Sequence, residues 1–189
     1  MNIRKKLTIL IFSTICASTP LIAAQSYNNN EEVCCYEKEY FNYVKLGGAE
    51  LTVGQEDDLT PAVGIGRRYE CGETAIDISI NFSTEEHQHS YIVTVPRIMY
   101  LVYTDPAANA SCYYGAGLSY LIQQSRDDED EITRKFEGIG GELAIGLEMQ
   151  RNSPFRSFIE LNLSQPIVPT NKKGSYPSPS LMATFGVGF

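Results

Sequence analysis

The feature that most constrains the fold of this chain is a strict alternation of apolar and polar residues in several short segments. In the clearest one, residues 76–83, Ile, Ile, Ile and Phe alternate with Asp, Ser, Asn and Ser. Successive side chains of a β-strand point to opposite faces, so this segment has one apolar and one polar face. The pattern recurs in residues 142–149, 158–164 and 181–189 and, less regularly, in residues 43–53, 62–69, 91–103 and 113–122. The sequence therefore predicts about eight strands, with an irregularity at Pro96 in segment 91–103.

The connections between these segments alternate between short and long. Short ones lie at residues 70–73, 105–110 and 151–154, and the longest ones at residues 124–134 and 166–179. Their Gly, Pro, Asn and Asp content is typical of turns. Transmembrane barrels have short periplasmic turns, longer outer loops and an even strand number. The predicted fold is an all-β, antiparallel, eight-stranded up-and-down transmembrane β-barrel over residues 40–189.

The first 24 residues have the pattern of a secretory signal peptide. A basic head at residues 4–6 precedes an apolar run from Leu7 to Cys16, and small residues end the segment at Ala23 and Ala24. Pro20 interrupts the apolar stretch, which argues against an uncleaved anchor helix. We expect export, with residues 25–39 forming a periplasmic segment before the barrel.

The polar faces of the predicted strands favour a lumen rather than a water-exposed surface. They combine both charge signs with glycines such as Gly66 and Gly146, as a narrow lumen filled by side chains requires. The predicted lumen ion pairs involve Lys45, Arg68, Asp77, Arg97, Glu142, Glu148 and Glu160. Aromatic girdles are predicted from Tyr69, Tyr100, Tyr114 and Phe189 at one end of the outward rows and from Phe82 and Tyr120 at the other. A soluble exported barrel or sandwich is the alternative interpretation.

Four cysteines follow the predicted signal peptide: Cys34, Cys35, Cys71 and Cys112. All four fall on the periplasmic side of the predicted barrel, in an oxidising compartment where disulfides form. We expect Cys34 and Cys35 to pair with Cys71 and Cys112, although the connectivity does not follow from the sequence. A zinc site made by the four thiolates is the alternative, but the sequence has no CxxC spacing.

Few residues suggest chemistry, and the sequence predicts no catalytic site, cofactor or metal ion. His87 and His89 precede Ser90 in an acidic loop, which a solvated loop explains as well as catalysis does. The acidic run at residues 127–131 is typical of a solvated loop, and binding of divalent cations or of a basic partner is the alternative. The formal charge of −8 argues against nucleic acid as a partner.

The leader, the eight alternating segments and the final Phe185-Gly186-Val187-Gly188-Phe189 resemble the small outer membrane β-barrels of the OmpA and OmpX type. The cysteine content looks more like that of chlamydial envelope proteins. The resemblance implies a C-terminal signal at Phe185, Val187 and Phe189 for the barrel assembly machinery, and contact with lipopolysaccharide. It also implies a structural or surface-interaction role, with extracellular or host surfaces as candidate partners. A lipid A-modifying enzyme and a narrow channel are alternatives within the same family.

Overall fold

The computed structural model describes residues 39–50, 59–84, 90–127, 132–169 and 179–189, apart from the side chains of residues 39 and 125–134. The predicted signal peptide, Cys34, Cys35, His87 and His89 lie outside the described residues. Eight strands form: β1 (Glu39–Glu50), β2 (Thr60–Cys71), β3 (Thr74–Thr84), β4 (Tyr91–Tyr103), β5 (Ala110–Asp127), β6 (Ile132–Met149), β7 (Arg156–Pro169) and β8 (Ser180–Gly188). Among the described residues, no helix is long and apolar enough to cross a membrane.

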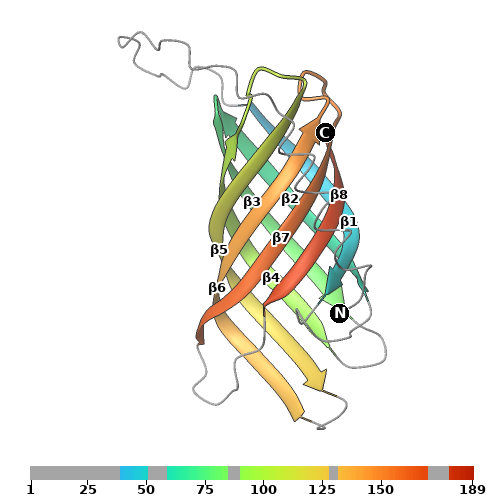
Figure 1. Ribbon diagram of the computed structural model, residues 1–189, viewed down its shortest axis with the longest axis vertical. Helices are drawn as coiled ribbons and strands as arrows, with labels where there is room; N and C mark the ends of the chain where they lie inside the picture. The colour runs from blue at the N-terminus through green and yellow to red at the C-terminus, as the bar shows by residue number, and fades with distance from the viewer. Residues whose placement is uncertain (1–38, 51–58, 85–89, 128–131, 170–178) are drawn as a thin grey trace, which may run out of the picture. The chain divides into compact units, whose positions relative to one another are not determined.

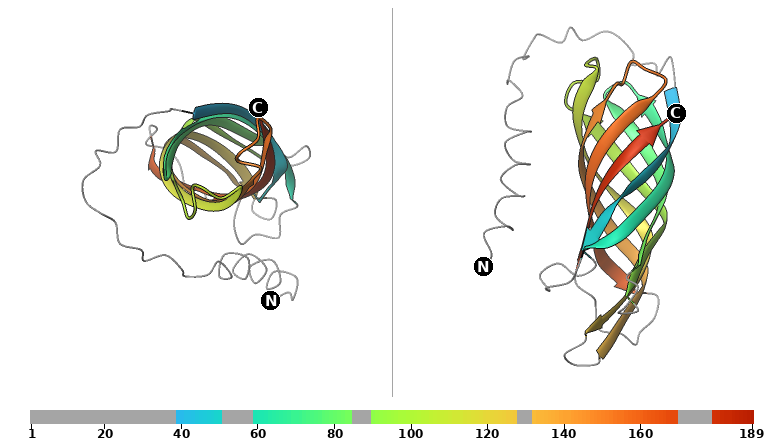
Figure 2. Two further views of the ribbon diagram at one scale, coloured as in Figure 1. Left: turned by 90° about the horizontal axis from the view of Figure 1, so that it is seen from above. Right: turned by 90° about the vertical axis from the view of Figure 1, so that its right-hand side faces the viewer.

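The eight strands close into one antiparallel barrel in which each strand pairs with its neighbours in the sequence and β8 pairs with β1. Figure 1 shows the strongly tilted strands, and the view along the barrel in Figure 2 shows the closed ring. The closure confirms the predicted fold class. Short connections at residues 72–73, 104–109 and 150–155 share one end, here called the short-turn end. The opposite end is called the long-loop end.

The strands alternate in burial with a period of two, and the apolar row faces outward. In β3, Asp77 is 0% exposed whereas the next residue, Ile78, is 41% exposed. The same polarity holds in β6, where Glu142 is buried and Leu143 is 56% exposed. A water-soluble barrel buries its apolar rows and exposes its polar ones. The orientation here is the opposite one, as the sequence predicts for a membrane barrel.

Two predicted loops are shorter than expected. The segment 124–134 was predicted as a loop, but β5 runs to Asp127, β6 begins at Ile132, and the two strands pair along their whole length. The segment 166–179 was also predicted as a loop, but β7 continues to Pro169. The β5–β6 ladder goes beyond its neighbours, because β4 pairing ends at Gln124 and β7 pairing ends at Gly138. The projecting part of this hairpin is not part of the closed barrel wall. Its residues therefore do not need the alternation of apolar and polar residues from which the strands were predicted.

The β4 strand carries the predicted irregularity. Its register against both neighbouring strands shifts at Val95 and Pro96, and on the β3 side Ile80 has no partner. Proline lacks the N–H that a ladder position needs, so it is tolerated where the pairing is interrupted. The shift leaves a local irregularity on the outer wall between β3 and β4.

Candidate functional site: the charged lumen and its two ends

The centre of the lumen holds a network of ion pairs organised around Glu160 of β7. Lys45 Nζ of β1 lies 2.8 Å from Glu160 Oε1, and Arg97 Nη2 of β4 lies 3.2 Å from the same oxygen. Tyr113 of β5 donates a hydrogen bond of 3.0 Å to Glu160 Oε2, and Arg68 Nη2 of β2 lies 3.5 Å from it. The Glu160 carboxylate of β7 therefore contacts side chains from four other strands: β1, β2, β4 and β5.

Arg68 is the second centre of this network, and it is 0% exposed. Its Nε donates to Asp77 Oδ2 at 3.0 Å, and its Nη1 donates to Glu148 Oε2 at 2.8 Å. The guanidinium carbon also lies 4.6 Å from the ring centroid of Tyr113 and 5.0 Å from that of Phe158. A buried guanidinium is stable only with both its charge and its N–H groups satisfied, and these contacts do so.

Glycines on the lumen face make room for the large aromatic side chains. Gly66 stands opposite Tyr43, and Gly146 stands opposite Tyr113. A Cβ added at either glycine would lie 2.5 Å from the hydroxyl oxygen of the facing tyrosine. The freed space lets Tyr43 donate to Asp77 at 2.8 Å and Tyr113 donate to Glu160. Pairing a small residue with a large one thus fills the lumen in layers.

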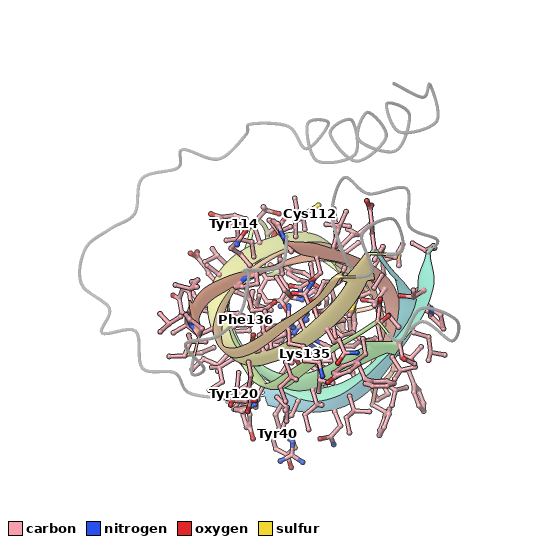
Figure 3. The ribbon with its side chains drawn as sticks, turned by 90° about the horizontal axis from the view of Figure 1, so that it is seen from below. Tyr40, Cys112, Tyr114, Tyr120, Lys135 and Phe136 are labelled. Carbon is pink, nitrogen blue, oxygen red and sulfur yellow. The ribbon has the colours of Figure 1, made fainter. Side chains whose placement is uncertain are left out.

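The lumen changes character toward the long-loop end. Glu142 first accepts hydrogen bonds from Ser119 at 2.6 Å, Ser164 at 2.8 Å and Asn162 at 2.9 Å. Beyond it comes an apolar layer of buried side chains, whose members are Ala49, Ala62, Ile92, Leu121, Phe136 and Met182. Figure 3 looks into this end and shows Phe136 within the ring, while Tyr40 and Tyr114 point away from it. The apolar layer closes this end of the lumen.

A cluster of charges closes the short-turn end. Arg156 donates to Glu70 at 2.6 Å and to Glu148 at 3.2 Å, and Arg151 donates to Glu70 at 3.2 Å. The guanidinium of Arg151 also lies 3.9 Å from the Tyr103 ring centroid. The alternation in the sequence does not identify Glu70, Arg151 and Arg156, because the first two lie in predicted turns and the predicted seventh strand begins only at Phe158. Inward residues alternate along a strand, so extending β2 from Arg68 by two residues predicts Glu70 as inward. Extending β7 back from Phe158 by two residues predicts Arg156 in the same way.

The buried charges of the described lumen balance. Five are basic and five are acidic: Lys45, Arg68, Arg97, Arg151 and Arg156 against Glu70, Asp77, Glu142, Glu148 and Glu160. Four of those at the centre, Arg68, Asp77, Arg97 and Glu148, are 0% exposed. Each of the five acidic groups lies within 4 Å of at least one of the five basic groups, so the charges are neutralised by one another.

The other predicted site residues lie apart from the lumen network. Phe185, Val187 and Phe189 point outward and are 50%, 38% and 58% exposed. Cys71, at the end of β2, is disulfide-bonded, and Cys112 lies half-buried near the start of β5.

The described residues show no arrangement for either of two alternatives from the sequence, a catalytic site at Ser90 and a metal site. Ser90 is 3% exposed at the long-loop end, and the histidines that precede it lie outside the described residues. The described part of the chain holds no group of three or more His, Cys, Asp or Glu residues arranged for a metal ion.

Substitution of Glu160 tests the lumen network. We expect Glu160→Gln to lower the free energy of unfolding by about 3–5 kcal/mol, because it leaves Lys45 and Arg97 without their shared carboxylate. The double variant Lys45→Met with Glu160→Gln should lose less than the sum of the two single losses. Urea unfolding of the refolded barrel measures these values, and Glu73→Gln, at an exposed turn position, is the matched control. Additive losses would contradict the pairing.

Comparison with known proteins supports the fold and goes no further. No protein-family model matches the sequence, and no curated protein matches it significantly. Among solved structures, Neisserial surface protein A (NspA) matches with a TM-score of 0.57 and 10% identity over 79% of this chain and 94% of that one. The N-terminal β-barrel domain of Pseudomonas aeruginosa OprF matches with a TM-score of 0.50 and 13% identity over 81% and 98%. The chain therefore has the fold of the small eight-stranded outer membrane β-barrels.

Proposed function

We propose that this chain is an integral outer membrane protein with a structural or surface-interaction role in the cell envelope. The observation that carries the proposal is the inside-out barrel, with exposed apolar rows on the wall and ten balanced charges in the lumen. An exposed apolar surface of this extent is stable in lipid and unstable in water. The short-turn end then faces the periplasm and the long-loop end faces outward.

The projecting end of the β5–β6 hairpin supports the surface-interaction part of the proposal. Beyond Gln124 and Gly138 the two strands pair with each other, whereas the pairing with β4 and β7 has ended. Figure 1 shows this hairpin extending past the rest of the described barrel at the long-loop end. Strand edges of this kind present backbone N–H and C=O groups for contact with another surface.

Cell fractionation and one wall substitution test the membrane placement. The protein should be recovered in the outer membrane fraction, and recovery in the soluble periplasm would contradict the proposal. Leu143→Arg should destabilise the barrel in liposomes by about 2–4 kcal/mol, because it places a charge on the lipid-facing wall. Equilibrium urea unfolding measures this loss. Leu143→Phe keeps the wall apolar and should leave the free energy of unfolding nearly unchanged.

The same barrel should not conduct ions. Side chains fill the centre, and an apolar layer that includes Leu121 and Phe136 lies between it and the long-loop end. Ions would have to cross both without their hydration water. In planar bilayers the reconstituted protein should show no current steps at any voltage, while a porin reconstituted in parallel should open. Reproducible steps from the folded protein would favour the channel alternative.

The disulfide at Cys71 is proposed to tie the N-terminal segment to the short-turn end, through Cys34 or Cys35. Among the described residues Cys71 is disulfide-bonded, and both candidate partners lie outside them. The same scheme pairs Cys112 with the remaining cysteine. Peptide mapping without reduction should recover a linked peptide that contains Cys71. Recovery of Cys71 as a thiol, together with bound zinc in the purified protein, would favour the metal site instead.

A further inference from the structure

A groove lies on the outer wall where the β4 irregularity interrupts the regular pairing. It is an open depression of about 540 Å³, and its lining comes from β1, β2, β3, the Val95-Pro96 step of β4 and the residue after β8. The outward residues of the lining are Asn42, Val44, Ile65, Arg67, Ile78, Ile80, Pro96 and Phe189. Pairing on the β4 side skips Ile80, so the wall is indented at this point. Six of these eight side chains are apolar, so the groove is an open apolar furrow with a polar rim.

The rim carries a cation, Arg67, that makes no ion pair with the acidic side chains of the described residues. Arg67 is exposed on the outward face of β2, where its Nε donates to Asn42 Oδ1 at 2.8 Å. Its guanidinium carbon lies 5.0 Å from the ring centroid of Tyr40. Within the described part of the chain, no carboxylate approaches Arg67 to ion-pair distance. The amide and the ring therefore orient the guanidinium, and no acidic side chain among the described residues neutralises its charge.

The height of Arg67 on the wall matches a membrane interface. The next outward residue toward the short-turn end is Tyr69, which pairs with Tyr40 and lies beside it with tilted rings whose centroids are 6.2 Å apart. Exposed tyrosines at the end of apolar rows mark the level of lipid headgroups. In the other direction the groove continues along Ile65 and Ile80, at acyl-chain depth. A cation at the interface suits the anionic phosphate of a phospholipid, and the apolar furrow beside it suits an acyl chain.

We propose that this groove binds one glycerophospholipid of the periplasmic leaflet. Arg67 holds the phosphate, because a guanidinium makes charge-assisted hydrogen bonds with phosphate oxygens. One acyl chain lies in the furrow over Ile65, Ile78, Ile80 and Pro96. This inference rests on the proposed membrane placement, which puts the short-turn end in the periplasm. Lipopolysaccharide is assigned to the opposite leaflet and does not reach this rim.

Native mass spectrometry of the refolded protein with phosphatidylglycerol tests the site. We expect Arg67→Gln to retain the lipid at least about tenfold more weakly than the wild type, from the loss of charge-assisted hydrogen bonds. A diglucosyl diacylglycerol with the same acyl chains should bind the wild type and Arg67→Gln equally. The charge-matched control is Lys135→Gln, which removes an exposed cation at the long-loop end and should change nothing.

A second pair of variants tests the furrow without touching the charge. Ile80→Trp fills it and should weaken phosphatidylglycerol retention, whereas Ile139→Trp alters an outward isoleucine that is also 43% exposed and should not. Heat-modifiable gel mobility checks that each variant is folded. Equal retention by Arg67→Gln and the wild type, or displacement of the lipid by equimolar lipopolysaccharide, would overturn the inference. Recovery of the protein from the soluble periplasm would instead overturn the proposed function, so the two failures are distinguishable.

Discussion

Mutual neutralisation of buried charges inside a closed eight-stranded wall is the interaction on which the rest of the structure depends. Backbone hydrogen bonds join each strand only to its two neighbours. The ion pairs join strands that are not neighbours: Lys45 of β1 contacts Glu160 of β7, and Arg68 of β2 contacts Glu148 of β6. Because these groups are excluded from water, each needs its partners to remain charged at acceptable free energy. The network therefore links strands through the lumen, including β2 and β6 on opposite sides of the barrel.

The proposed surface-interaction role involves the outside of the barrel, where the described residues form three surfaces: the projecting hairpin at the long-loop end, the short-turn end with Cys71, and the wall itself. The wall is not uniform, because the shift at Pro96 indents it and Arg67 places one cation beside the indentation. The same pairing irregularity that a regular barrel avoids is thus what gives this barrel a shaped surface toward lipid.

The alternation in the sequence was enough to predict the strands and their faces, because a period of two assigns every residue of a strand once one residue is assigned. It correctly placed Ile78 outward and the strand count at eight. It could not say which inward residues meet across the lumen, since Lys45 and Glu160 come together through strand tilt and stagger, which no single strand encodes. It also failed at strand ends, such as Arg156 and Asp127, where the wall is no longer in contact with lipid and apolar residues are not required.

Arg67 and Arg68, which are adjacent in β2, have different roles because their side chains lie in different environments. Period-two geometry sends Arg68 into the lumen and Arg67 onto the wall. Arg68 is neutralised by Asp77 and Glu148, so the fold itself accounts for its charge. The outward row on either side of Arg67 is Val63, Ile65 and Tyr69, and an apolar residue at position 67 would continue that row without any need for a counter-ion. Asn42 and Tyr40 hold the cation in place, an anion at the interface stabilises it there, and phosphate is the anion that a bilayer provides at that depth.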